Sequence, residues 1–310
     1  MPEPLIQLRP QQAEFFGCGY KHAYALHRRR AGKSFLIASR CWMRMGLFQG
    51  RGCFVASASI SAGQENILKE AEIWYTVIDK WRKLAAESGK KLTSPALDDK
   101  GEMLDIDAIA DLFEHSKLEA RLYFNRKKFS RTKLLAANPR TARSYGGDVY
   151  LDECCFVEDY RGVLDAIEPI QQDNPQYEFW ELSSPPADDS HPLYSILLPP
   201  EGATFSPNPR GNWYETEQGI PVHHFDAYDG ELAGMTPFRS AKGKILTIAE
   251  ARAAAVDRAA FDRNYLLLFN SSSTAAIARE HLIAAQHRGR TLDCDGIDLM
   301  GDRITINSAL

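Results

Sequence analysis

The sequence predicts an α/β protein in which helices flank a central, mainly parallel β-sheet. Two observations predict this class. Short apolar runs alternate along the chain with stretches of helical periodicity, which is the order of βα units in a parallel sheet. Several of these runs end directly in polar or glycine-containing segments, and open α/β sheets bind ligands beyond the carboxyl ends of their strands. We therefore expect motifs that are far apart in the sequence to meet at one edge of the sheet.

The chain has 310 residues, of which 44% are hydrophobic and 25% charged, with a formal net charge of −4. This length suits one large domain, or one domain with an appendage. No apolar run is long enough to cross a bilayer, and residues 1–9 lack the features of a signal peptide. We therefore expect a cytosolic protein. The six cysteines include no Cys-x-x-Cys pair and follow no disulfide-scaffold spacing, so we expect reduced thiols in the core. The negative charge means that contact with nucleic acid needs a local basic patch.

The periodicity predicts these elements in order. The strands are His22–Leu26, Cys53–Ser57, Thr132–Ala137, Asp148–Leu151 and Tyr177–Leu182. The main helices are Ser34–Met45, Ala62–Glu87 and Ile248–Phe269, with a further helix at Ile277–His287. We expect a polar break at 88–101 and an extended surface segment with little regular structure at 183–219. The resulting organisation is a core at 1–247, a helical lid at 248–290 and a tail at 291–310.

The segment after the first strand has the features of a phosphate-binding loop. It reads His27-Arg28-Arg29-Arg30-Ala31-Gly32-Lys33-Ser34, and an apolar helix follows from Phe35. In such loops backbone N–H groups and the helix N-terminus surround phosphate oxygens, the lysine reaches the terminal phosphates and the hydroxyl holds Mg²⁺. His27 stands where the common pattern has glycine. For this segment alone, a chance Gly-Lys-Ser is the alternative interpretation.

Two adjacent carboxylates, Asp152 and Glu153, end the apolar strand that begins at Asp148. Hydrolytic enzymes with phosphate-binding loops use such a pair: the first carboxylate holds Mg²⁺ and the second polarises the attacking water. A solvated acidic turn is the alternative interpretation, and it becomes less attractive when a phosphate-binding loop is present in the same chain.

The strand that ends at Leu182 is followed by Ser183, Ser184 and Pro185. Hydroxyl groups at this position could sense the terminal phosphate, or the water that attacks it, and pass the signal to the next segment. An ordinary exit from a strand is the alternative interpretation.

Together these elements resemble the ATPase domain of the large terminase subunit, the motor that packages DNA into the heads of tailed bacteriophages. Arg29-Arg30-Ala31-Gly32-Lys33-Ser34 matches the arginine-rich loop of that family, in which the first glycine is replaced. Leu8-Arg9-Pro10-Gln11-Gln12 resembles its adenine-reading segment, Arg143-Ser144-Tyr145-Gly146-Gly147 is also familiar there, and Ser183-Ser184-Pro185 resembles its coupling motif. The resemblance covers residues 5–290.

The resemblance implies a RecA-like P-loop NTPase fold of the type with an additional catalytic glutamate, and ATP and Mg²⁺ as cofactors. It implies that Lys33 binds the β and γ phosphates, that Ser34 and Asp152 hold Mg²⁺, and that Glu153 activates water. The arginine-finger candidates are Arg29 and Arg143. The implied ATP-binding set is Gln12, Arg28, Arg29, Arg30, Ala31, Gly32, Lys33, Ser34 and Phe35, and the coupling set is Ser183, Ser184 and Pro185.

The same resemblance implies a motor that moves double-stranded viral DNA, in the cytoplasm of an infected bacterial host. The implied partners are double-stranded DNA, the capsid portal protein, the small terminase subunit and further copies of the chain in a ring. Large terminases usually carry a nuclease domain after the ATPase, and this sequence stops at Leu310. Asp293, Asp295 and Asp298 have no following sheet to hold a two-metal site, so we expect no nuclease activity and interpret the last residues as a tail or the start of a linker.

Three rival functions remain at this stage: a helicase-type DNA-dependent ATPase, a small-molecule phosphotransferase and a non-catalytic ATP-binding assembly protein. The first would need a second RecA-like domain, and Glu153 beside Asp152 disfavours the other two.

Two other groups of residues have both a structural and a functional interpretation. His223 and His224, followed by Asp226 and Asp229, suggest a metal site, but adjacent residues of a strand point to opposite faces, so a structural role is favoured. Basic residues at 126–133 form either a solvated hairpin or a contact for a DNA backbone.

Overall fold

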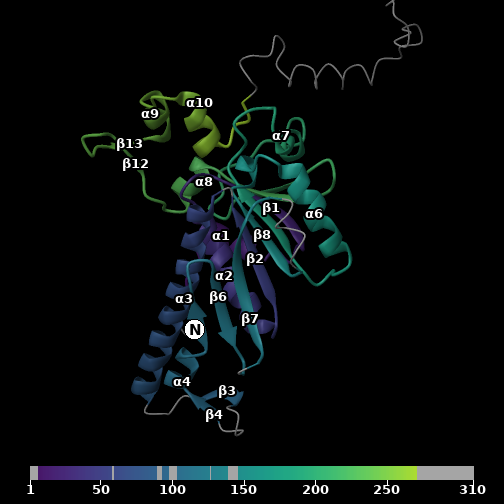
Figure 1. Cartoon of the computed structure of the whole chain (residues 1–310). Helices are drawn as coiled ribbons and strands as arrows, with labels where there is room; N and C mark the ends of the chain where they lie inside the picture. Colours follow the sequence, from purple (N-terminus) through teal and green to yellow (C-terminus); the bar gives the residue numbers. More distant parts are fainter. Residues whose placement is uncertain are drawn as a thin grey trace, which may run out of the picture.

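A computed structural model describes residues 6–57, 59–88, 93–97, 103–125, 127–138 and 146–270. Its centre is a nine-stranded sheet with the strand order β10-β11-β1-β9-β8-β2-β7-β6-β5. The inner strands from β11 to β7 are all parallel, whereas β10, β6 and β5 at the two edges run antiparallel to their neighbours (Figure 1). The predicted class, an α/β fold with a mainly parallel central sheet, is confirmed.

The strands of the large sheet are β1 (His22–His27), β2 (Gly52–Ser57), β5 (Phe113–His115), β6 (Glu119–Tyr123), β7 (Phe129–Ala136), β8 (Asp148–Asp152), β9 (Phe179–Ser183), β10 (Asn212–Glu215) and β11 (Pro221–Phe225). Two small sheets pair β3 (Thr93–Leu97) with β4 (Met103–Asp105) and β12 (Phe238–Arg239) with β13 (Ile245–Leu246).

The helices include α1 (Pro10–Phe16), α2 (Lys33–Leu47), α3 (Ile60–Ser88), α4 (Ile106–Ala110), α6 (Tyr160–Gln172), α7 (Pro192–Leu197), α8 (Ala227–Leu232), α9 (Ile248–Ala253) and α10 (Arg258–Phe261). A 3-10 turn, η1 (Cys154–Phe156), follows β8, and a π-helical turn, η2 (Asp262–Leu266), follows α10. None of the helices in the described part of the chain is both long enough and apolar enough to span a membrane.

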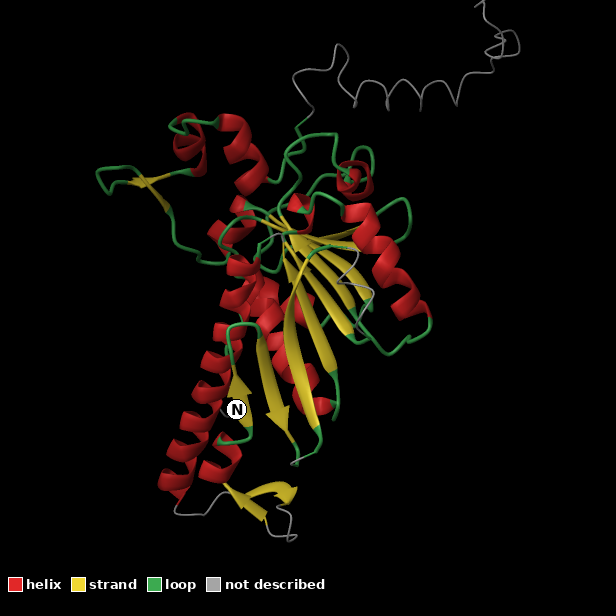
Figure 2. Ribbon diagram, viewed as in Figure 1, coloured by secondary structure: helices red, strands yellow, loops and turns green. Residues whose placement is uncertain are grey.

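The sheet is covered on both faces, because its strand residues alternate between two apolar layers. In β1, Ala23 and Ala25 pack in one layer with residues of α1, α2 and α3, whereas Tyr24 and Leu26 pack in the other with residues of α6 and α7. Figure 2 shows α6 on the opposite side of the sheet from α3. Burial on both faces explains why the inner strands read as near-continuous apolar runs.

The five predicted strands are all present, with boundaries shifted by one to three residues. Four strands of the large sheet were not predicted: β5, β6, β10 and β11. Three of them are the antiparallel edge strands, of three to five residues each, and only β11 lies inside the parallel part. These strands are short, and β11 is polar at its two histidines, so only β6 carries a clear alternation of buried and less buried residues.

The single helix predicted at Ile248–Phe269 is wrong. The structure has three short pieces, α9, α10 and η2. Asp257 caps a new helix by accepting a hydrogen bond from the Ala260 N–H at 2.9 Å, and the preceding Val256 is fully exposed. An alanine-rich composition predicted helix, but the capping aspartate restarts the chain in a new direction.

Two loop predictions are also wrong in part. The expected polar break contains β3, which pairs with β4, and the excursion at 183–219 contains α7 and β10. The predicted helix Ile277–His287 and the three terminal aspartates lie outside the described residues.

Candidate nucleotide-binding site

The predicted motifs meet at the carboxyl edge of three adjacent strands. β1 leads into the glycine-containing loop, β9 beside it ends in Ser183, and β8 beside β9 ends in Asp152. The Ser34 hydroxyl lies 3.4 Å from Asp152 Oδ2, although 118 positions separate the two residues in the sequence. The expectation that distant motifs converge on one edge is confirmed.

The loop has a backbone shape that depends on Gly32. Gly32 has φ +88°, and a Cβ atom there would lie 2.5 Å from Gln12 Nε2. The Gln12 amide donates to the Gly32 carbonyl at 2.9 Å and accepts from the Arg9 N–H at 2.9 Å. Gln12 is buried and braces the loop from the side of α1.

Lys33 begins α2 and is buried at the base of the loop. Its ammonium donates to the His27 carbonyl at 3.5 Å and forms an ion pair with Glu153 Oε1 at 3.3 Å. The ammonium therefore lies between the start of the loop and the residue that follows β8. It stands at the N-terminus of a long helix, where anions are stabilised.

Asp152 is a buried carboxylate with incomplete hydrogen bonding. Its Oδ2 lies 3.4 Å from Ser34 Oγ and 3.5 Å from Asn66 Nδ2, and its Oδ1 has no partner among the described residues. Burial, followed by the charge of Glu153, raises the pKa of Asp152 to about 6. An unpartnered carboxylate oxygen beside a serine hydroxyl is the donor set that a hard cation such as Mg²⁺ prefers, so these residues fit that ion.

Glu153 has an uncommon backbone conformation for a side-chain-bearing residue. It lies in the left-handed region with φ 56° and ψ 47°, which turns the chain from β8 into η1. Its side chain is 37% exposed, and its Oε2 accepts a hydrogen bond from the Ser183 hydroxyl at 3.3 Å. Ser183 in turn accepts from the Cys155 N–H at 3.3 Å, so the ends of β8 and β9 are joined.

The arginines of the loop lie in different surroundings. Arg28 is buried, and its guanidinium lies over the rings of Phe238 at 5.2 Å and Tyr265 at 5.4 Å. Arg29 and Arg30 are exposed, and the Arg29 N–H donates to the Asn264 carbonyl at 2.8 Å. Arg143, the other finger candidate, lies outside the described residues.

No protein-family model and no curated protein matches the chain. Among solved structures, it is similar to the large terminase ATPase domain of Thermus phage P74-26, with a TM-score of 0.51, 17% identity and coverage of 85% of this chain and 100% of that one. An arginine-to-alanine variant of that domain gives a TM-score of 0.52 at 16% identity, again covering 85% of this chain and all of that one.

The fold is that of a phage large terminase ATPase domain. At this level of identity the likeness is one of architecture, so each side chain of the site must be placed from this chain's own geometry.

Within this terminase ATPase fold, sequence reasoning missed the partner of His27. Its Nε2 lies 2.8 Å from His223 Nδ1, and His223 Nε2 lies 2.8 Å from the Arg210 carbonyl. Because a carbonyl only accepts, His223 donates from Nε2 and accepts from His27 at Nδ1. Burial lowers the pKa of His27 well below its usual value, so the pair is neutral and ties the start of the loop to β11.

Asn66 was also missed. It lies on α3, is fully buried, and reaches Asp152 from a segment that carries no recognisable motif. The two histidines of β11 do face opposite layers, as predicted: His223 packs near Phe15 in the layer of α1–α3, and His224 stacks on Phe205 in the layer of α6 and α7. Cys154 and Cys155 are buried in that second layer, in keeping with a packing role.

Proposed function

We propose that this chain is an ATP-hydrolysing motor domain that drives double-stranded viral DNA into a capsid. The observation that carries this proposal is the convergence of Lys33, Ser34, Asp152 and Glu153 at one sheet edge. These are the residue types that phosphoryl transfer to water needs: a cation for the terminal phosphates, a magnesium-binding pair and a base. The terminase ATPase fold supports the motor role by analogy.

Ser34 and Asp152 would hold Mg²⁺, which when bound neutralises charge on the phosphates. Lys33 would contribute a second positive charge to the same phosphates. Glu153 would accept a proton from the attacking water, and its partial exposure and its hydrogen bond from Ser183 support this role by leaving the carboxylate accessible and oriented.

A signal from the phosphate site would pass through the end of β9. Ser183 contacts Glu153, and the next residue, Ser184, lies 3.5 Å from Asn264 Oδ1 in η2. A change at Glu153 would therefore reach the segment that also contacts the loop through the Asn264 carbonyl. This chain of contacts supports Ser183 and Ser184, which Pro185 follows, as coupling residues and the segment that contains η2 as part of a lid.

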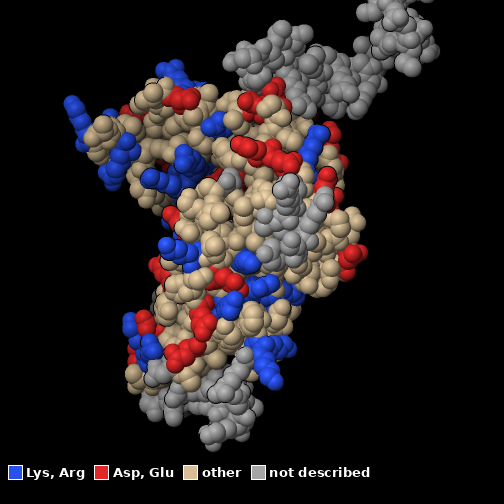
Figure 3. Space-filling model, viewed as in Figure 1, with Lys and Arg blue, Asp and Glu red and all other residues tan. Residues whose placement is uncertain are grey.

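Two exposed basic surfaces support a contact with DNA. One is the turn between β6 and β7, with Lys127 and Lys128. The other is the segment containing β12 and β13, with Arg239, Lys242 and Lys244 exposed, and basic side chains gather over this region in Figure 3. An overall negative chain would bind a phosphate backbone through such local patches, with affinity that falls as salt rises.

The test compares wild type with Glu153→Gln, measuring nucleotide binding and steady-state ATP hydrolysis with and without double-stranded DNA. Loss of the base should reduce turnover by at least about 100-fold while nucleotide affinity changes by only a few-fold. Glu158→Gln is the matched control, because Glu158 is exposed and lies only five positions further along. Undiminished hydrolysis by Glu153→Gln would contradict the mechanism, and hydrolysis indifferent to DNA would contradict the motor role.

The finger candidates need a mixing experiment. If Arg143 or Arg29 acts on the nucleotide of a neighbouring subunit in a ring, the alanine variant of that residue should depress the activity of wild-type chains when the two are combined. Activity that falls only in proportion to dilution would assign the residue to its own subunit's site.

A further inference from the structure

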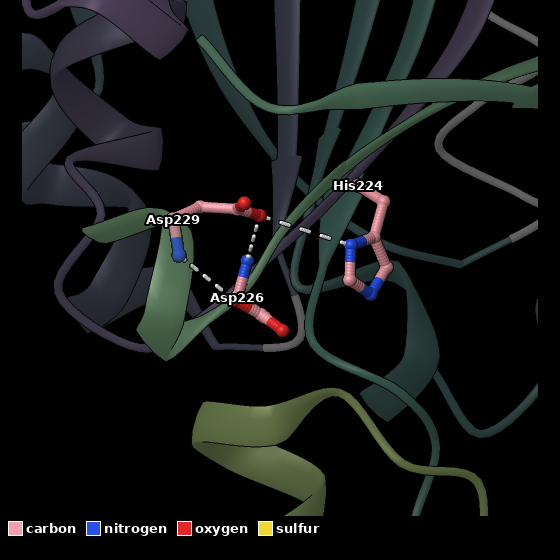
Figure 4. Close-up of side chains that lie close together, drawn as sticks. All are labelled: His224, Asp226 and Asp229. Atoms are coloured by element: carbon pink, nitrogen blue, oxygen red, sulfur yellow. Dashed lines mark hydrogen bonds and ion pairs between the residues drawn. The ribbon is translucent and has the colours of Figure 1, made fainter. Parts of the chain in front are cut away.

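We propose that His224, Asp226 and Asp229 form a binding site for a divalent transition-metal ion of the Zn²⁺ type, distinct from the proposed magnesium site. The three residues lie at the end of β11 and the start of α8. One ligand atom from each lies within 4.8 Å of the others (Figure 4). The inference does not depend on ATP hydrolysis, because it rests on other side chains.

His224 provides the observation that points to a ligand. Its side chain is 7% exposed, and its Nδ1 is a buried nitrogen with no hydrogen-bond partner among the described residues. This nitrogen faces Asp229 Oδ2 at 4.0 Å, which is too long for a hydrogen bond (Figure 4). Burial, followed by the neighbouring His223, lowers the pKa of His224 to about 4, so the imidazole is neutral at pH 7, the form that binds metals.

The two carboxylates are held in place by backbone N–H groups. Asp226 Oδ1 accepts from the N–H groups of Tyr228 at 2.8 Å and Asp229 at 3.0 Å, and Asp229 accepts from the N–H groups of Asn208 at 2.7 Å and Asp226 at 2.9 Å. This helix cap accounts for the acids but leaves the His224 nitrogen unexplained. No described group donates to Asp226 Oδ2, so this oxygen and His224 Nδ1 both remain able to bind a metal ion.

The donor set favours particular metals. One imidazole and two carboxylates suit Zn²⁺ or Mn²⁺, whereas Mg²⁺ prefers oxygen ligands and retains its waters. Metal–ligand bonds of about 2.0–2.2 Å place ligand atoms roughly 3.0–3.5 Å apart, so atoms that lie up to 4.8 Å apart must approach one another by up to about 1.5 Å on binding. Burial raises the pKa of Asp226 to about 6, against the opposing effect of the hydrogen bond from the Asp229 N–H.

The position of the cluster indicates what a metal ion would do. The Phe225 carbonyl, between His224 and Asp226, accepts from the Arg28 N–H of the phosphate-binding loop at 2.9 Å. Gly230 of α8 packs so closely on Arg28 that a Cβ atom there would lie 2.8 Å from its Nη1. An ion that joins β11 to α8 would therefore fix the surface against which Arg28 packs while its guanidinium lies over the rings of Phe238 and Tyr265.

The experiment titrates the full chain with ZnCl₂ after treatment with a chelator, without nucleotide or Mg²⁺, using a chromophoric chelator as competitor. The expected result is one Zn²⁺ per chain and a raised thermal midpoint. His224→Gln and Asp226→Asn should each weaken binding by at least about tenfold. Asparagine is itself a good helix cap, so the loss in Asp226→Asn would not reflect unfolding.

Matched controls separate this cluster from other ligands. His115→Gln removes an exposed histidine elsewhere, and Asp152→Asn removes the proposed magnesium ligand; both should bind Zn²⁺ as wild type does. Co²⁺ substitution should give a visible spectrum without thiolate charge-transfer bands. Binding that survives both ligand variants, thiolate bands, or the absence of saturable binding would overturn the proposal.

Discussion

Acidic residues at the amino ends of β8 and β9 are paired with arginines, whereas Asp152 at the carboxyl end of β8 is incompletely paired. At the amino ends, Asp148 forms a bidentate pair with Arg44 at 2.7 and 2.8 Å, and Glu178 pairs with Arg40 at 2.6 and 2.9 Å. At the carboxyl ends, the contacts of Asp152 are 3.4 and 3.5 Å long and one of its oxygens has no partner among the described residues.

Asp148, Glu178 and Asp152 are all buried, so burial alone does not distinguish the two ends. At the amino ends each carboxylate has a guanidinium matched to its geometry, which offsets the cost of removing the charge from water. At the carboxyl edge that compensation is left incomplete, and the same edge holds Gly32 and Glu153 with positive φ. The amino ends are paired in a way that stabilises the fold, whereas the carboxyl edge has the incomplete pairing that the proposed cation and phosphate site requires.

The largest expected effect is the loss of a buried ion pair at the amino end of β8. Arg44→Met should leave Asp148 buried and underpaired, and reduce the free energy of unfolding by roughly 3–5 kcal/mol. Chemical denaturation measures this change. The matched control is Lys244→Met, which breaks the ion pair with Glu250 between side chains that are 72% and 47% exposed, and should cost less than about 1 kcal/mol. Equal losses in the two variants would remove the contrast between a buried and an exposed pair.

An intermediate effect on the free energy of unfolding, of opposite sign, is expected at Asp152 at the carboxyl end of β8. Because the pKa of Asp152 is raised to about 6 from 3.8, the folded state favours the protonated form, and ionisation destabilises the fold as pH rises from about 4 to above 6. With a chelator present to remove metal ions, Asp152→Asn should therefore have a free energy of unfolding at pH 7 that is about 1–3 kcal/mol higher than that of wild type.

The advantage of Asp152→Asn should disappear when unfolding is measured below about pH 4, where the aspartate is protonated in both states. The same variant should lose magnesium-dependent hydrolysis. A variant less stable than wild type at pH 7 would show that Asp152 contributes to folding, as Asp148 and Glu178 do.

The smallest effect concerns the hydrogen bonds that join the carboxyl ends of β8 and β9. Ser183→Ala removes the hydrogen bond to Glu153 and should lower ATP turnover by roughly two- to tenfold, because the base itself remains. The free energy of unfolding should change by about 1 kcal/mol or less. Unchanged hydrolysis would argue against Ser183 as an orienting residue, and Ser195→Ala, at an exposed position of α7, is the control.

The sequence by itself determined the parallel core and the main parts of the candidate site. Apolar runs buried on both faces carry their strand signal locally, and Gly32, Lys33, Ser34 and Asp152 belong to motifs whose spacing is set by the loop and by the strand end. Because carboxyl ends of parallel strands share an edge, their convergence followed from fold class alone.

Only the tertiary structure decided the partners that come from elsewhere in the chain. Asn66 reaches Asp152 from the helix α3. His27 is held by His223 of β11, a strand that was not predicted. Arg28 lies against the rings of Phe238 and Tyr265. The pairing of β11 with β1 belongs to the same class. Each of these contacts joins segments far apart in sequence, and such contacts leave no periodic signal in the residues that make them.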